Sequence, residues 1–146
     1  MLCAIVVLNL LLFCPAYGKT FGPFSVEVPA GWEAEYNAEA GNASLILSNA
    51  GKSAEVSLVV TSLEGETFTE YMEFLAQEGL PGASKPEKQG NGTWVIKYDH
   101  QAYGLAGTEI YTPIERYGLY CLTILGQDPA LEQVVGSIKF DFKADF

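Results

Sequence analysis

The chain has 146 residues and a formal net charge of −10, with 8 Lys and Arg against 18 Asp and Glu. This length suits one domain, and 49% apolar with 18% charged residues is typical of a globular protein and not of a disordered one. Nucleic acids and anionic lipids are bound through clustered Lys and Arg, so the acidic balance argues against both as partners.

Residues 1–18 carry no charged side chain. An almost unbroken apolar run from Leu2 to Phe13 precedes the small-residue pattern Ala16-Tyr17-Gly18, which is typical of a secretory signal peptide. As a helix this run would rise only about 18 Å, which is too short for a bilayer core of about 30 Å. A lipoprotein signal is disfavoured because Phe13 directly precedes Cys14.

We therefore expect cleavage near Gly18, export to the periplasm or the extracellular space, and no stable membrane insertion after cleavage. Residues 19–146 then form a single soluble domain. The leader lacks Lys and Arg, so a start codon further upstream stays an open alternative. Cys121 is the one cysteine left after cleavage, which excludes an internal disulfide, and its apolar surroundings predict a buried thiol.

Alternating apolar residues and turn signals predict a series of strands. We expect Phe24–Val28 to form a hairpin with Trp32–Ala38 across Pro29-Ala30-Gly31. The other predicted strands are 43–48, 54–63, 93–101, 105–112 and 117–126. The last of these is apolar on both faces, which indicates a middle strand covered above and below.

Two helices interrupt the strands. Thr67-Phe68-Thr69-Glu70 fits a capping box, and the apolar stripe behind it runs to Leu75 before Gly79 ends the helix. Asp128-Pro129 predicts the start of a second helix, with a stripe from Leu131 to Ile138. The tail Phe140–Phe146 alternates like a strand, and pairing at a sheet edge or fraying both stay open.

Short turns join antiparallel neighbours, so this order of elements predicts an α+β domain with a largely antiparallel sheet. The opening Phe24–Trp32, with its Pro-x-Gly-Trp, and the closing Ser137-Ile138-Lys139-Phe140 resemble the PsbP/DcrB-like family. The resemblance covers nearly all of residues 21–140. It implies an α/β/α sandwich with helices packed on a central antiparallel sheet. It also implies a mostly non-enzymatic role, with no catalytic motif to carry over.

Catalytic chemistry is poorly represented in the sequence. His100 is the only histidine, and nothing in the spacing brings it to Cys121, so we expect no nucleophilic dyad and no zinc site. Glu64, Glu66, Glu70 and Glu73 are explained by the positive end of the first helix dipole. We expect no catalytic residues, no cofactor and no metal.

The sequence thus predicts an exported, non-enzymatic binding or assembly module that acts on a protein partner in the cell envelope. Two alternatives stay open, a carrier of a small apolar ligand and a carboxylate-based hydrolase. Ile114, Arg116 and Tyr117 are the candidate partner-binding residues, because aromatic residues beside an arginine are typical of interfaces. The sequence gives no oligomeric state.

Overall fold

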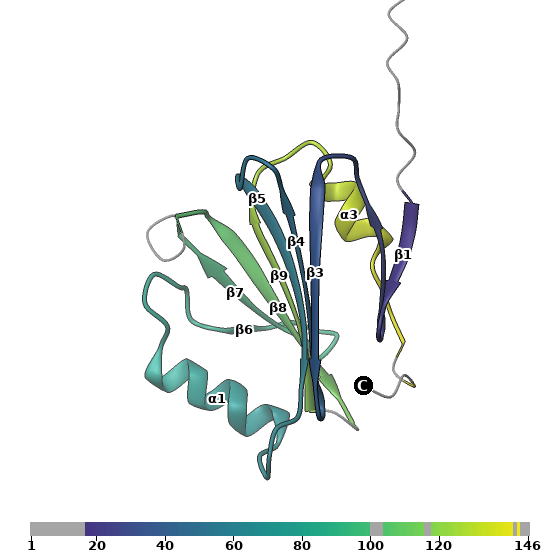
Figure 1. Cartoon of the computed structure of the whole chain (residues 1–146). Helices are drawn as coiled ribbons and strands as arrows, with labels where there is room; N and C mark the ends of the chain where they lie inside the picture. Colours follow the sequence, from purple (N-terminus) through teal and green to yellow (C-terminus); the bar gives the residue numbers. More distant parts are fainter. Residues whose placement is uncertain (1–16, 100–103, 116–117, 142, 144–146) are drawn as a thin grey trace, which may run out of the picture.

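The computed structural model describes residues 17–99, 104–115, 118–141 and 143, and about half of the chain forms antiparallel strands. A small sheet has the order β1-β2-β10, and a large sheet has the order β3-β4-β5-β9-β8-β7-β6 (Figure 1). The small sheet consists of β1 (Tyr17–Phe21), β2 (Phe24–Val28) and β10 (Lys139–Phe140). The large sheet consists of β3 (Trp32–Glu39), β4 (Asn42–Asn49), β5 (Ala54–Thr61), β6 (Glu87–Lys88), β7 (Trp94–Tyr98), β8 (Gly107–Ile114) and β9 (Gly118–Gly126). The helices are α1 (Phe68–Glu78) and α3 (Leu131–Ser137).

The predicted α+β fold, an α/β/α sandwich with helices packed on a central sheet, is wrong. Strands account for 50% of the chain and helices for 15%, and there are two sheets instead of one. The physical reason lies at the two ends of the described chain. Tyr17–Phe21 and Lys139–Phe140 pair with β2 on either side, so a second sheet lies where the prediction placed a helical layer.

The predicted hairpin between Phe24–Val28 and Trp32–Ala38 is also wrong. β2 pairs with β1 and β10, whereas β3 pairs with β4. Gly31 has a φ of +79° at the corner between β2 and β3, a conformation that glycine adopts without steric cost. The chain therefore crosses from one sheet to the other at this corner.

Strand β9 lies at the centre of the large sheet, between β5 and β8, as its two apolar faces predict. Its alternate side chains enter two separate cores. Tyr120 and Leu122 pack in the first core, between the large sheet, the small sheet and α3. Leu119 and Cys121 belong to the second core, between the large sheet and α1.

The first core is the larger of the two. Fully buried side chains from both sheets and from α3 meet in it, among them Phe24, Leu47, Leu58 and Val134. Phe140 of β10 lies against Phe24, with 5.7 Å between ring centroids. Of the two alternatives left open for the tail, its first residue pairs, since Phe140 lies opposite Phe24 of β2. Asp141 and Lys143 follow without a strand, and the other residues of the tail lie outside the described ranges.

The second core depends on α1. Met72 and Leu75 point from this helix onto Ile96, Tyr98 and their neighbours on the sheet. The predicted capping box is confirmed: the Thr67 Oγ1 accepts a hydrogen bond from the Glu70 N–H (3.3 Å), and the Glu70 carboxylate accepts one from the Thr67 N–H (2.8 Å). The bond from the Thr67 backbone, with help from its hydroxyl, holds the pKa of Glu70 below its usual value.

The second predicted helix exists but begins later than expected, at Leu131. Asp128 still stabilises the start of this helix, because its Oδ1 accepts a hydrogen bond from the Ala130 N–H (2.8 Å). Its Oδ2 accepts a second hydrogen bond from the Asn49 side chain (2.8 Å). These two bonds, the backbone one first, hold the pKa of Asp128 below its usual value. The contact with Asn49 ties α3 to the end of β4.

The predicted leader falls mostly outside the described residues, which include only Tyr17 and Gly18 of it, as the start of β1. Within the described ranges, no helix is long and apolar enough to span a bilayer. His100 also lies outside the described residues.

Candidate binding surface on the large sheet

The two faces of the large sheet are covered to different extents. The first core lies on one face and extends over β3, β4 and β5. On the opposite face, the second core is built on β7, β8 and β9, beneath α1. The outward side chains of β3, β4 and β5 on the α1 side form what we call the open face. They are Glu33, Glu35, Asn37, Glu39, Asn42, Ser44, Ile46, Ser48, Glu55, Ser57, Val59 and Thr61.

Strand register places these side chains in rows that run across the sheet. Glu35 lies opposite Ile46, and Ile46 lies opposite Ser57. The same row continues through Thr123 to Glu109 on β8. The open face and the groove described below are therefore parts of one continuous surface.

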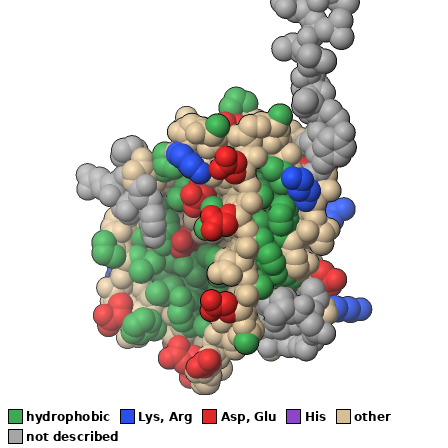
Figure 2. Space-filling model, in the orientation of Figure 1, with side chains coloured by type: hydrophobic (Ala, Val, Ile, Leu, Met, Phe, Trp, Pro, Cys, Tyr) green, Lys and Arg blue, Asp and Glu red, His purple; other side chains and the backbone are tan. Residues whose placement is uncertain are grey.

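A groove of about 360 Å³ lies where the open face meets α1. Tyr71 of α1 forms one wall, and side chains of β5, β8 and β9 form the floor. The floor residues are Glu55, Ser57, Val59, Thr61, Glu109, Tyr111, Leu119, Cys121, Thr123 and Leu125. In Figure 2 this part of the surface is hollowed, with hydrophobic side chains beside acidic ones.

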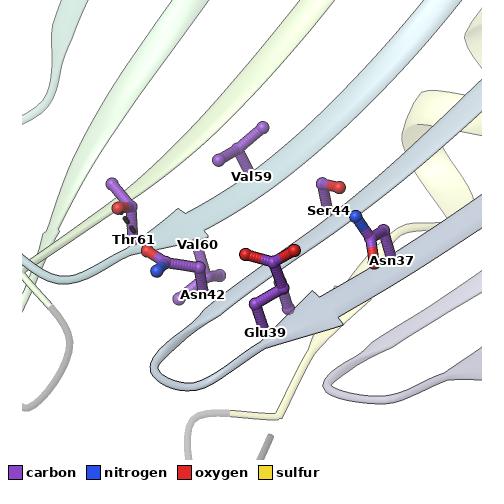
Figure 3. Close-up of a pocket in the computed structure, with 8 residues that line it drawn as sticks. Asn37, Glu39, Asn42, Ser44, Val59, Val60 and Thr61 are labelled. Atoms are coloured by element: carbon purple, nitrogen blue, oxygen red, sulfur yellow. Dashed lines mark hydrogen bonds between the residues drawn. The ribbon is translucent and has the colours of Figure 1, made fainter.

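Two further depressions extend the groove over the open face. One, of about 140 Å³, shares Val59 and Thr61 with it and lies among side chains of β3, β4 and β5 (Figure 3). There the Thr61 hydroxyl donates a hydrogen bond to the Asn42 side-chain oxygen (2.6 Å). The other, of about 320 Å³, shares Glu55 with the groove and includes Glu33, Glu35 and Lys52.

Glu109 is held on the groove floor by three hydroxyl groups. Its Oε2 accepts hydrogen bonds from Tyr98 (2.7 Å) and Tyr111 (2.6 Å), and its Oε1 accepts one from Thr123 (3.3 Å). Such a network compensates the half-buried carboxylate for the water it has lost. Burial, with the nearby Cys121 and Glu109, raises the pKa of Tyr111 far above its usual value, so its hydroxyl stays protonated and donates.

Cys121 is a buried free thiol, as predicted. Burial and the nearby Glu109 carboxylate raise its pKa to about 12. A thiol reacts as a nucleophile through its thiolate, and almost none is present near neutral pH at this pKa. Cys121 therefore fills space in the groove floor, where its Sγ lies 3.9 Å from the Thr123 hydroxyl.

The groove contains two carboxylates, Glu55 and Glu109, but their arrangement does not favour hydrolysis. Strand spacing puts their Cα atoms about 12 Å apart, with β9 between them. Glu109 is also occupied by its three hydroxyl donors. Among the described residues, no group of three or more His, Cys, Asp or Glu side chains is placed to hold a metal ion.

The open face is acidic and exposes few large apolar groups. Glu33, Glu35 and Glu39 are all exposed on β3. Ile46 is 38% exposed in the middle of this face, and Phe74, on the outer side of α1, is 55% exposed. Lys52, in the turn between β4 and β5, donates a hydrogen bond from its Nζ to the Ser48 hydroxyl (2.7 Å).

Of the three predicted partner-binding residues, the structure describes only Ile114. Ile114 is 7% exposed and packs in the first core, because it ends strand β8 facing the small sheet. Ile114 is therefore unsuited to contact a partner. Arg116 and Tyr117 lie outside the described residues.

Sequence reasoning missed the acidic residues of β3. A signal was present, since Glu33 and Glu35 share one side of the predicted strand Trp32–Ala38, whose other side carries Trp32, Ala34 and Tyr36. Glu39 follows that strand in the same alternation. A scan against protein-family models and a search of curated proteins each found no match.

Proposed function

We propose that the protein is an exported, non-enzymatic binding module that holds a protein partner on the open face. The partner contributes a positively charged segment. One observation carries this proposal: α1 leaves half of its sheet face uncovered, and that half presents Glu33, Glu35, Glu39 and Glu55 beside a groove.

Charge defines the kind of partner. The chain carries a net charge of −10, and acidic side chains two residues apart on a strand, such as Glu33 and Glu35, are about 6.6 Å apart. A cationic segment relieves the repulsion among these carboxylates and is attracted to them over a distance of about 8 Å at physiological ionic strength. Ile46 and the groove give such a segment an apolar contact beside the charged ones.

The test is the binding of a fluorescently labelled heptalysine peptide, followed by anisotropy. We expect the variant with Glu33→Gln, Glu35→Gln and Glu39→Gln to bind at least tenfold more weakly than the parent chain. The matched control carries Glu73→Gln, Glu78→Gln and Glu132→Gln, which removes the same charge from exposed helix positions. Equal weakening in both variants would show that net charge alone attracts the peptide, and would contradict a site on the open face.

A small-ligand carrier is the second candidate, and the groove favours it. Its volume of about 360 Å³ lies in the range of small-molecule sites, and Tyr71 and Tyr111 line it. Binding of the uncharged fluorophore N-phenyl-1-naphthylamine, lost on Val59→Glu but kept in the Glu33, Glu35 and Glu39 variant, would favour the carrier over the protein-binding module.

Export is tested separately. We expect the secreted chain to begin at Lys19, since cleavage is proposed after Gly18. Amino-terminal sequencing of the protein recovered outside the cytoplasm measures this directly. Recovery of the chain only in the cytoplasm, with its leader intact, would contradict export and leave the proposed binding surface unaffected.

A further inference from the structure

Strand β3 is an edge of the large sheet. It is eight residues long and, within the part of the chain that the structure describes, pairs with β4 on one side only. The other edge strand, β6, has two residues. Five of the eight residues of β3 are exposed, so this is the long, accessible edge of the protein.

The hydrogen-bond pattern shows which backbone groups of β3 face away from β4. The Ala50 N–H donates to the Gly31 carbonyl (3.0 Å), in register with the ladder of β3 and β4. Because hydrogen-bonded and non-hydrogen-bonded pairs alternate in antiparallel strands, the odd-numbered residues of β3 bond to β4. The N–H and C=O groups of Ala34, Tyr36 and Ala38 therefore point to the free edge.

The same alternation determines what an added antiparallel strand would meet. Its residues opposite Ala34, Tyr36 and Ala38 would exchange backbone hydrogen bonds with β3. Its residues opposite Glu33, Glu35 and Glu39 would form the closer, non-hydrogen-bonded pairs, about 4.5 Å between Cα atoms. Side chains at those positions lie on the open face, where opposite charge is favourable.

We propose that the partner binds by adding a strand to β3, and that this strand carries Lys or Arg at alternate positions. The inference rests on the proposed function and specifies its mode of recognition. Backbone bonds to the free edge would supply affinity, and the alternating charge would set register and specificity.

A second copy of this chain is a poor occupant of the same edge. Antiparallel pairing of β3 with its own copy would put glutamates opposite or diagonal to glutamates across the interface. Like charges at such positions are destabilising. The acidic edge thus disfavours self-pairing while it favours a basic strand.

The test compares three peptides on the parent protein. The first is Lys-Thr-Lys-Thr-Lys-Thr-Lys, which alternates as proposed. In the second, each Thr carries a backbone N-methyl group, which removes the donors that would face β3 but keeps every charge. The third has the same composition with its lysines in one block. We expect N-methylation to weaken binding at least tenfold, and the block peptide to bind at least threefold more weakly than the alternating one.

Equal binding of the alternating and N-methylated peptides would overturn strand addition, while the proposed acidic surface would stand. The same holds if heptalysine binds and the alternating peptide does not. If none of the cationic peptides binds, both the strand addition and the proposed function fail.

A variant of the protein gives a second test. Ala38 is exposed and near the end of β3, and its N–H points away from β4. Ala38→Pro removes this donor without removing a bond to β4, and Ala38→Val is the matched control that keeps the donor. We expect the proline variant alone to bind the alternating peptide at least threefold more weakly, with β3 cross-peaks retained in its NMR spectrum. Unchanged binding would contradict the proposed edge.

Discussion

The two faces of the large sheet differ in what covers them. On one face, the small sheet and α3 bury side chains of β3, β4 and β5 in the first core. On the other face, α1 and the segments that flank it, through Leu63, Leu80 and Ala83, cover β7, β8 and β9. The same three strands therefore hold the fold together with one set of alternate residues and present a charged surface with the other.

The size of the cover explains this difference. Seven strands at about 4.8 Å spacing span about 29 Å, whereas one helix with its side chains is about 10 Å wide. A single helix can thus cover two or three strands. Among the described residues one helix lies on that face, so part of the face stays open. The side chains on that open part are mostly polar.

The largest expected effect tests whether the Cys121 thiol is buried in the groove floor. In a chain with Cys3→Ser and Cys14→Ser, alkylation of Cys121 by iodoacetamide at pH 8 should be about a thousandfold slower when folded than when unfolded. Its raised pKa of about 12 leaves on the order of 0.01% thiolate at this pH, against about 10% at an ordinary pKa near 9. The folded rate should rise about tenfold per pH unit as long as the fold persists. A folded rate close to the unfolded one would show an accessible, reactive thiol.

The next effect compares adjacent residues of β4 that point to opposite faces. Leu47 is fully buried in the first core, whereas Ile46 is on the open face. Leu47→Ala should lower the free energy of unfolding by about 3 kcal/mol, and Ile46→Ala by less than about 1 kcal/mol. Urea denaturation measures both. Similar losses would mean that the two faces are equally covered.

A smaller effect is expected at the boundary between the covered and open halves. Tyr111→Phe removes one of three hydroxyl donors to Glu109 and should cost about 1–2 kcal/mol of unfolding free energy. Thr123→Val serves as a comparison, because its hydroxyl is farther from the carboxylate, at 3.3 Å. No loss in either variant would show that the network does not stabilise the fold.

The capping box of α1 should contribute about as much to the free energy of unfolding as the Tyr111 hydroxyl does. Thr67→Ala should lower the free energy of unfolding by about 1 kcal/mol, because the Glu70 N–H loses its acceptor. The pKa of Glu70 is lowered in the folded state, so its own contribution is present above its unfolded pKa and declines as pH falls through the folded one. A Thr67→Ser control keeps the cap and should be close to the parent.

The smallest effect is expected on the open face. Replacing Glu33, Glu35 and Glu39 by glutamine should change the free energy of unfolding by no more than about 0.5 kcal/mol per site. These exposed residues serve no core contact, and reduced repulsion would act in the stabilising direction. A loss of several kcal/mol would show that the acidic residues of β3 belong to the fold and not to a binding surface.

Local signals in the sequence predicted the local structure well. The Thr67–Glu70 capping box, the two-faced strand β9 and the buried Cys121 are all confirmed, because each depends on neighbours in sequence or on a simple apolar pattern. The number of sheets was not predictable in this way. Tertiary packing decides whether Phe24–Val28 pairs with the strand that follows it or with the preceding strand and a segment more than 100 residues away. The alternation of Phe24–Val28 is the same in both cases.

The candidate site shows the same contrast between local patterns, which the sequence predicts, and tertiary packing, which it does not. Ile114 was predicted to bind a partner because Arg116 and Tyr117 are close to it in sequence. Its burial, however, depends on which face of β8 meets the small sheet. The alternating glutamates of β3 can be recognised in the sequence. Their proposed role in binding depends on β3 being an edge strand, which only the sheet order shows. The family resemblance stays a prediction.

Strand β10 has a consequence for the order in which the protein can fold. Lys139 and Phe140 pair with Ser25 and Phe24, so the small sheet joins the first described strands to the last one. During synthesis, more than 100 residues must be added after Phe24 before Phe140 is available to pack against it. The first core therefore cannot be completed until the residues of β10 have been synthesised.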